Sequence, residues 1–183
     1  MEIHLGCVVE GHGETEAVPV IVRRIAGEID PAIAIRIPPP IRTPKSKLLK
    51  PRELERAVEL AARKLEGPGG VFVLLDSDDD CPAERGPELL TRAITARADV
   101  PIAVVLAKRE FEAWFLAAAV SLRGHRGLPD DLQPPPDPEN VHGAKEWLSD
   151  RMVSGRGYSE TLDQTAFAAV FDLGLARRSD SFD

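Results

Sequence analysis

The chain has few cysteines and no long apolar run. Its 183 residues include two cysteines, Cys7 and Cys81, too few for a disulfide framework. No stretch approaches the ~18 apolar residues that a membrane span needs. The start of the chain lacks the basic segment and following apolar run of a signal peptide. We therefore expect a reduced, cytoplasmic protein that does not associate with a membrane.

The chain also lacks the motifs that bind nucleotides. The segment "EGHGETE", residues 10–16, joins an apolar stretch to a helical pattern, where a phosphate-binding loop could lie. Glu14 and Thr15 stand where the Walker motif needs a lysine and a Ser or Thr, and the Rossmann glycine fingerprint is absent. Glu10, Glu14 and Glu16 would repel an anion from the start of the helix. The segment favours a cation instead.

An EF-hand calcium loop is excluded at the acidic segment "DSDDD", residues 76–80. Asp76, Asp78 and Asp80 match the opening of such a loop. Cys81 then takes the position of the turn glycine, and Pro87 takes that of the bidentate glutamate. The preceding apolar run predicts a buried strand, which is the wrong context for an EF-hand.

Charge is unevenly distributed along the chain. Its net charge is -7, so the protein as a whole does not attract nucleic acid. One segment contains basic residues and no acidic ones: Arg36, Arg42, Lys45, Lys47, Lys50 and Arg52. It contains several prolines and predicts a flexible basic loop, on which Lys45, Lys47 and Lys50 are candidate contacts for nucleic-acid phosphates. A solvated loop that serves only solubility is the alternative.

Apolar runs alternate with segments of helical spacing. The runs predict strands at residues 3–9, 32–37, 71–75 and 100–107, and the helical spacing predicts helices at residues 15–29, 52–65, 87–98, 109–122, 144–152 and 161–173. This alternation predicts an α/β fold, a Rossmann-like parallel sheet of about four strands with helices on both faces. We expect a single domain overall, in which residues 1–123 form the core and residues 124–183 add a proline-rich loop and a helical extension.

Acidic residues follow the ends of the predicted strands. Glu10 follows the first strand, Asp76, Asp78 and Asp80 follow the third, and Glu112 comes shortly after the fourth. In a parallel sheet all these ends lie at one edge, so Glu10 and the aspartates converge if the first and third strands are neighbours. Mg²⁺ prefers such oxygen ligands. The alternative is that Asp76 caps a turn and the other aspartates are solvated.

Several motifs give the chain a resemblance to a known family. They are "VEGxGETE", "LLDSDDD", "AKREFEAWFLA", "GAKEWL" and "YSETLDQ", in that order along nearly the whole chain. With them the chain resembles the Toprim-like proteins labelled DUF 4276. Toprim domains occur in topoisomerases, primases and related nucleases, and some relatives of this type serve as effector nucleases in bacterial defence against phage.

The resemblance implies roles for particular residues. Glu10 would be a metal-site or general acid–base glutamate, and Asp76 and Asp78 would bind Mg²⁺ or Mn²⁺. Glu14 and Asp80 would support this site or hold a second metal. Glu112 would complete the acidic site, although a carboxylate at the start of a helix is equally favoured by the helix dipole.

The sequence therefore predicts a Mg²⁺-dependent nuclease or phosphodiesterase of Toprim type that acts on DNA or RNA. A second hypothesis is a non-catalytic subunit that docks to another protein such as an ATPase, and a homodimer is also compatible with the sequence. A third is a phosphoacceptor domain, for which Lys108 is the nearest lysine after the last strand.

Overall fold

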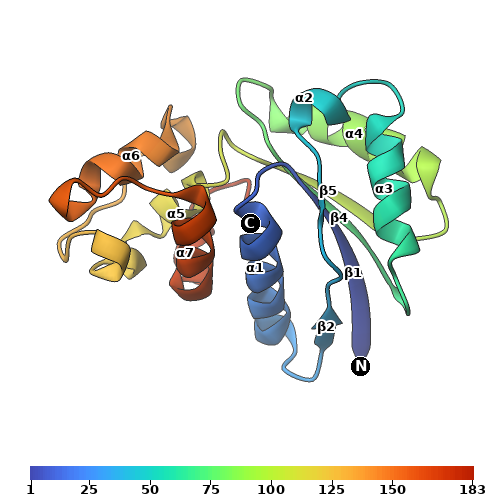
Figure 1. Ribbon diagram of the computed structural model, residues 1–183, viewed down its shortest axis with the longest axis horizontal. Helices are drawn as coiled ribbons and strands as arrows, with labels where there is room; N and C mark the ends of the chain where they lie inside the picture. Colours follow the sequence, from blue (N-terminus) through green and yellow to red (C-terminus); the bar gives the residue numbers. More distant parts are fainter.

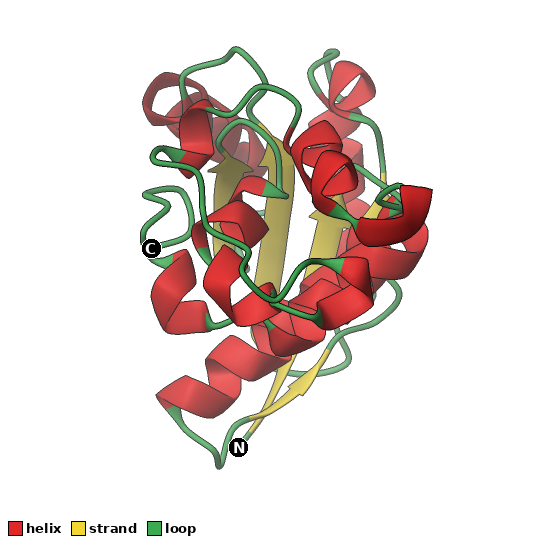
Figure 2. Ribbon diagram, turned by 90° about the vertical axis from the view of Figure 1, so that its left-hand side faces the viewer, coloured by secondary structure: helices red, strands yellow, loops and turns green.

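The protein is an α/β structure built on one parallel sheet. The computed structural model describes residues 1–183, apart from the side chain of Ser154. The sheet is five-stranded with the order β2-β1-β4-β5, and β3 pairs with β1. The strands are β1 (Glu2–Val9), β2 (Ala34–Arg36), β3 (Ile41–Arg42), β4 (Gly69–Asp76) and β5 (Ile102–Ala107). Helices flank it (Figures 1 and 2). The predicted α/β fold with a parallel sheet is confirmed.

The first and third predicted strands are neighbours. β1 and β4 pair in parallel, with Val8 opposite Val73. β5 continues the sheet beyond β4, with Asp76 opposite Ala107. All three long strands therefore end at the same edge. The short strand β3, which the proline-rich sequence does not predict, pairs with the last residues of β1 at this edge.

The helices are more numerous than the sequence indicates. They are α1 (Glu14–Ile29), α2 (Lys45–Leu48), α3 (Glu53–Arg63), α4 (Pro82–Ala96), α5 (Ala113–Ala117), α6 (Ala144–Arg151), α7 (Thr165–Val170) and α8 (Leu173–Ala176). Helix α2 lies where we predicted a flexible loop. Helix α4 starts before Pro87, because Pro82 suits the first turn of a helix.

The predicted helix over residues 109–122 is wrong in its extent. It is replaced by α5 and a 3-10 turn at Ala119–Leu122. The segment before α5 contacts the end of β4 instead: the N–H of Phe111 donates a 2.7 Å hydrogen bond to the side chain of Asp76.

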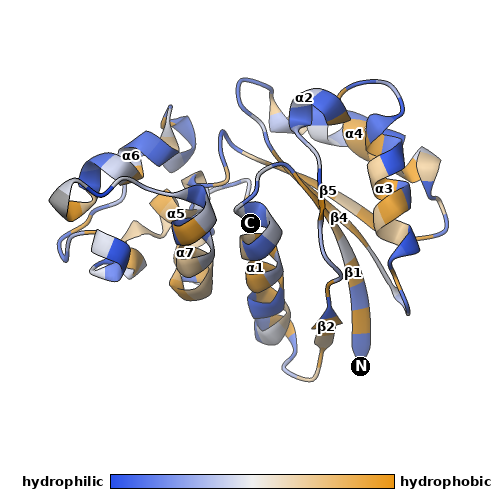
Figure 3. Ribbon diagram, in the orientation of Figure 1, coloured by the Kyte–Doolittle hydropathy of each residue, from blue (hydrophilic) through white to orange (hydrophobic). Residues whose placement is uncertain are grey.

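Alternate residues of β4 pack on opposite faces of the sheet. Val71, Val73 and Leu75 face the helices α3 and α4, where Leu54, Val58 and Leu89 are buried. Leu74 faces the other side, toward α1 and α5. Apolar residues dominate β4 and β5 in Figure 3. Burying each such side chain stabilises the fold by about 1.5–3 kcal/mol, which explains why both faces are covered by helices.

The C-terminal helices belong to the core beside α1. α7 lies alongside α1 (Figure 1), and Phe167 and Phe171 are buried in the same cluster as Val18 and Ile21. Arg24 of α1 donates hydrogen bonds of 2.7 and 2.6 Å to the carbonyl oxygens of Ala168 and Phe171. The C-terminal segment is thus fixed against the first helix.

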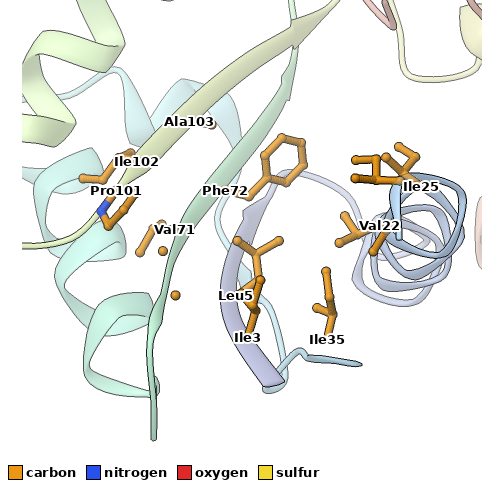
Figure 4. Close-up of a pocket in the computed structure, with 14 residues that line it drawn as sticks. Ile3, Leu5, Val22, Ile25, Ile35, Val71, Phe72, Pro101, Ile102 and Ala103 are labelled. Carbon is orange, nitrogen blue, oxygen red and sulfur yellow. The ribbon is translucent and has the colours of Figure 1, made fainter. Parts of the chain in front are cut away.

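An apolar groove lies at the opposite end of the strands from the acidic residues. It has a volume of about 590 Å³ and is lined by the first halves of β1, β4 and β5 and by α1. Figure 4 shows Leu5 and Phe72 facing Val22 and Ile25 across it. At its end Ile29 is 74% exposed. The groove contains no titratable side chain, so it does not contribute to the acidic site described below.

In the part of the chain that the structure describes, no helix has the length and apolar character required to cross a membrane.

Candidate functional site

Four glutamate and aspartate side chains gather where β1, β4 and β5 end. We call Glu10, Glu14, Asp76 and Glu112 the carboxylate cluster. Glu10 follows β1, Glu14 begins α1, Asp76 ends β4 and Glu112 precedes α5. The parallel strands place these residues at one edge of the sheet. The charge of Glu14 acts on Asp76, that of Glu112 acts on Asp76, and that of Glu10 acts on Glu14.

Asp76 lies near two other members of the carboxylate cluster, Glu14 and Glu112. Burial raises the pKa of its carboxyl well above the usual value, and the nearby carboxylates of Glu14 and Glu112 raise it further. The hydrogen bond from the N–H of Phe111 and the cation of Lys145 oppose this rise. Additional positive charge near Asp76 would therefore favour its ionised form.

Glu14 connects the first turn of α1 to the end of β1. Its Oε2 accepts a 2.9 Å hydrogen bond from the backbone N–H of Glu10. Glu14 is buried, and this burial raises the pKa of its carboxyl despite that hydrogen bond. The contact fixes the turn that presents Glu10.

Glu112 is fully buried and has one oxygen without a partner. Its Oε1 accepts hydrogen bonds of 2.9 Å from the hydroxyl of Tyr158 and from Nε2 of Gln164. Its Oε2 has no hydrogen-bond partner among the described residues. Burial raises the pKa of Glu112 to about 7, although Lys145 and the Tyr158 hydroxyl oppose the rise.

Glu10, like Glu112, has one carboxylate oxygen with a hydrogen-bond partner and one without. Its Oε1 accepts a 3.1 Å hydrogen bond from the backbone N–H of Lys45. Its Oε2 is buried and, within the described part of the structure, lacks a partner. Buried polar atoms normally have partners, so an unpartnered carboxylate oxygen on each of Glu10 and Glu112 requires an explanation.

Lys145 supplies positive charge beside the carboxylate cluster. It lies in the first turn of α6, and its Nζ is 2.7 Å from Oε1 of Glu160. Burial alone would lower the pKa of Lys145, but the charges of Glu112, Glu160 and Asp76 outweigh burial and raise it. Lys145 is therefore a cation at neutral pH.

Glu110 fixes the helix that carries Lys145. Its Oε1 accepts hydrogen bonds from the backbone N–H groups of Gly143 and Ala144, at 3.1 and 3.2 Å. These groups lie at the start of α6 and have no partner within the helix. The "REFEAW" and "GAKEWL" motifs are thus connected through this cap.

Asp78 and Asp80 do not join the carboxylate cluster. Strand β4 ends at Asp76, and Asp78 adopts a left-handed backbone conformation with φ of 52°. The N–H of Asp80 bonds back to the carbonyl of Ser77, which closes a turn. Both side chains instead contact Nζ of Lys45, at 2.8 Å from Asp78 and 3.1 Å from Asp80.

The expected metal set of Glu10, Asp76, Asp78 and Asp80 is thus divided in space. The alternation of a strand would have placed Asp76 and Asp78 on one face, but the turn at Asp78 redirects the second side chain. Asp79 forms an ion pair with Arg109. Glu14 and Glu112, which the sequence analysis also assigns to the acidic site, belong to the carboxylate cluster.

The three candidate phosphate contacts on the basic segment differ in their environments. The side chain of Lys45 is 7% exposed and paired with aspartates, so it does not face solvent. Lys47 and Lys50 are exposed, and Lys47 lies 3.6 Å from Glu53. Lys47 and Lys50 are the members of this set that can reach a solvent phosphate.

The donor atoms of the carboxylate cluster suit a hard divalent cation. Carboxylate oxygens are the ligands of Mg²⁺ and Mn²⁺, and the free oxygens of Glu10 and Glu112 are two such atoms. Among the described residues, no three His, Cys, Asp or Glu side chains form a ready-made metal cage. An ion bound here by one or two carboxylates would keep most of its waters, as Mg²⁺ usually does.

Sequence reasoning missed three residues that act on the carboxylate cluster, Tyr158 and Gln164 by hydrogen bonds and Lys145 by its charge. Each lies in a motif that the sequence analysis names, but without an assigned role. Gln164 contacts Glu112 although the two residues are 52 positions apart in the sequence, and no local sequence pattern predicts such a contact. The sequence offered one indication of these contacts: the motifs "GAKEWL" and "YSETLDQ" occur in the same chain as the acidic motifs.

Comparisons with known proteins identify one match. The family model described as "Domain of unknown function (DUF4276)" matches residues 9–183. No curated protein and no solved structure matches the chain. The matched region contains the carboxylate cluster together with Lys145, Tyr158 and Gln164. The chain therefore belongs to the DUF4276 family.

Proposed function

We propose that the protein is a divalent-cation-dependent phosphodiesterase that acts on nucleic acid. The observation that carries this proposal is that Glu10 and Glu112 each have a buried, unpartnered carboxylate oxygen, Oε2, at the edge of the sheet where the half-buried Asp76 lies near Glu112. A buried carboxylate without a partner is costly, and a bound cation would offset that cost. The resemblance to Toprim nucleases, and to those active in bacterial defence, supports the same assignment.

One or two carboxylates among Glu10, Asp76 and Glu112 would hold Mg²⁺ or Mn²⁺, and the ion would keep most of its waters. When bound, such an ion polarises a phosphoryl oxygen and lowers the pKa of a coordinated water. Glu14 holds the backbone of Glu10 in place through its 2.9 Å hydrogen bond. Tyr158 and Gln164 hold Oε1 of Glu112 and leave its Oε2 free for the ion.

Lys145 would contact a non-bridging oxygen of the scissile phosphate. Its ammonium lies between the carboxylate cluster and the partly exposed Glu160, which anchors it. A fixed cation beside the reacting phosphate stabilises the charge that develops during hydrolysis. Lys47 and Lys50, exposed on and after α2, would guide the strand toward this edge.

Cleavage assays with matched variants test the proposal. Purified protein is incubated with duplex DNA, single-stranded DNA and RNA, with Mg²⁺, Mn²⁺ or EDTA. We expect cleavage that needs the metal and is lost in Asp76→Asn and Glu112→Gln but retained in Glu16→Gln, which changes an exposed glutamate of α1. Metal-independent activity, or full activity in both cluster variants, would contradict the proposal.

A second candidate function is a subunit that docks to another protein. The apolar groove of about 590 Å³ and the 74% exposed side chain of Ile29 favour it, because such surfaces often mark protein contacts. It predicts that Mn²⁺ does not bind at the carboxylate cluster. Calorimetric titration with Mn²⁺, which binds in the first proposal, separates the two.

A further inference from the structure

The ammonium of Lys45 occupies a complete cation position formed by the turn after β4. Its Nζ lies 2.6 Å from the carbonyl oxygen of Ser77, 2.8 Å from Asp78 Oδ2 and 3.1 Å from Asp80 Oδ2. A lysine ammonium has three N–H donors, and here each has an oxygen. The side chain of Lys45 is 7% exposed, so the lysine is largely shielded from solvent in this contact.

The backbone fixes Lys45 in this position. Its N–H donates to Oε1 of Glu10, and Leu48 of the same short helix is fully buried in the core beneath α3. Lys45 thereby connects Glu10 of the carboxylate cluster to the turn that carries Asp78 and Asp80. Lysine usually lies on the surface, so its burial here indicates a specific electrostatic role.

The oxygen atoms around Lys45 are ligands of a kind that divalent cations use. Two aspartates and a backbone carbonyl within one turn resemble in composition the sites of Mg²⁺ and Ca²⁺. With the ammonium removed, Asp78 and Asp80 would repel each other, and a divalent ion would relieve that repulsion. The bound ammonium thus stands where a second metal could bind.

We infer that Lys45 is a built-in cation that excludes a second divalent ion from this edge of the sheet. In the wild-type protein, Asp78 and Asp80 then bind no metal, and divalent binding at this edge is confined to the carboxylate cluster. The second part of this inference, that divalent ions bind at the carboxylate cluster, rests on the proposed function. The first part, the occupation of Asp78 and Asp80 by Lys45, is independent of it.

Counting bound Mn²⁺ tests the inference. Free Mn²⁺ is followed by electron paramagnetic resonance during titration of the wild type, Lys45→Met, Lys45→Arg and the control Lys47→Met, which changes an exposed lysine of the same helix. Lys45→Met is expected to bind one more Mn²⁺ per chain than the wild type. Lys45→Arg and Lys47→Met are expected to match the wild type.

The added ion must depend on the two aspartates. Adding Asp78→Asn and Asp80→Asn to Lys45→Met is expected to restore the wild-type number of bound ions. Equal binding by Lys45→Met and the wild type, with both folded by circular dichroism, would overturn the inference. So would an added ion that persists without the aspartates.

A second experiment tests the inference without changing Lys45. Asp78→Asn with Asp80→Asn in an otherwise wild-type chain is expected to leave the number of bound Mn²⁺ unchanged, and a decrease would overturn the inference even if Lys45→Met fails to fold. The proposed function fails separately: a wild type that binds no Mn²⁺, with one ion in Lys45→Met, would refute the metal site at the carboxylate cluster and support the role of Lys45.

Discussion

Gln164 and Glu112 are joined by a 2.9 Å hydrogen bond between segments 52 residues apart. Gln164 belongs to a π-helical turn, Glu160–Gln164, a conformation that is rare and frequent at functional sites. The same side chain packs against Gly13 at the start of α1, where an added Cβ would lie 2.2 Å from Gln164 Oε1. The C-terminal segment thus closes over the carboxylate cluster, and this closure requires a glycine at position 13.

Gly13→Ala is expected to disrupt the packing of the C-terminal segment against the start of α1. The new Cβ would also lie 2.3 Å from the carbonyl oxygen of Glu160, a backbone atom that cannot rotate away. We expect a loss of about 1–3 kcal/mol in the free energy of unfolding, measured by urea denaturation, together with weaker Mn²⁺ binding.

Gly27→Ala in the same helix is the control. Its Cβ meets nothing within 4 Å, so it is expected to stabilise the protein by about 0.5–1 kcal/mol. Equal effects of the two changes would contradict this account.

The metal-free protein is expected to lose stability as the pH rises from about 5 to about 8. Burial raises the pKa of Glu112 from 4.5 to about 7, so the folded state binds this proton more tightly than the unfolded state. The resulting stability is complete below the unfolded pKa and is lost as the pH passes through the folded value. At about 1.4 kcal/mol per pKa unit, the loss is on the order of 3 kcal/mol.

Urea denaturation in EDTA across this pH range measures the effect. Asp76 and Glu14 also have raised pKa values and contribute with the same sign, so Glu112→Gln should reduce the pH dependence without removing it. Saturating Mg²⁺ should reduce the loss at high pH, because the ion binds the ionised carboxylates. Stability that rises over this range in EDTA would show that the carboxyls are not buried as described.

Lys145→Met is expected to separate catalysis from metal binding. If Lys145 contacts the phosphate, kcat should fall by about 10²-fold or more. Affinity for Mn²⁺ should be retained or increased, since a positive charge beside the carboxylate cluster is removed. Lys64→Met, which changes an exposed lysine with no proposed role in binding, is the control. A lysine with only a structural role would instead lower stability and leave kcat unchanged.

Asp163 is expected to be the residue that holds the C-terminal segment together. It is fully buried, and its carboxylate contacts the guanidinium groups of Arg126 and Arg156, both partly exposed. Asp163→Ala would leave these cations without a partner and cost about 2–4 kcal/mol, less than for a fully buried pair because the guanidinium groups reach solvent. Urea denaturation checks this, with Asp131→Ala at an exposed site as the control. A change within about 0.5 kcal/mol of the control would contradict the assignment.

The sheet and the gathering of acidic residues at one edge were accessible from the sequence. Alternating strands and helices imply parallel strands, and this requires Glu10 and Asp76 to leave the sheet at a common edge. The expectation that Asp78 shares a metal site with Asp76 did not include the pairing of Asp78 with Lys45. It treated the aspartates as a continued strand, whereas the left-handed residue at Asp78 turns the chain toward Lys45.

Contacts between distant segments could not be predicted. The partners of Glu112 come from Tyr158 and Gln164, whose positions depend on how α6 and α7 pack against α1 and α5. The burial of Lys45 has the same origin. In sequence it is one of several lysines in a basic segment, and only the fold distinguishes it from the exposed Lys47.

Anomalous diffraction from crystals soaked in Mn²⁺ tests the central claim most directly, because it locates the ion. The account predicts a peak at the carboxylate cluster, within metal-bonding distance (about 2.1 Å for Mg²⁺) of an oxygen of Glu10, Asp76 or Glu112, and no peak at Asp78 and Asp80. A peak between Asp78 and Asp80, or none at the cluster at saturating Mn²⁺, would contradict it.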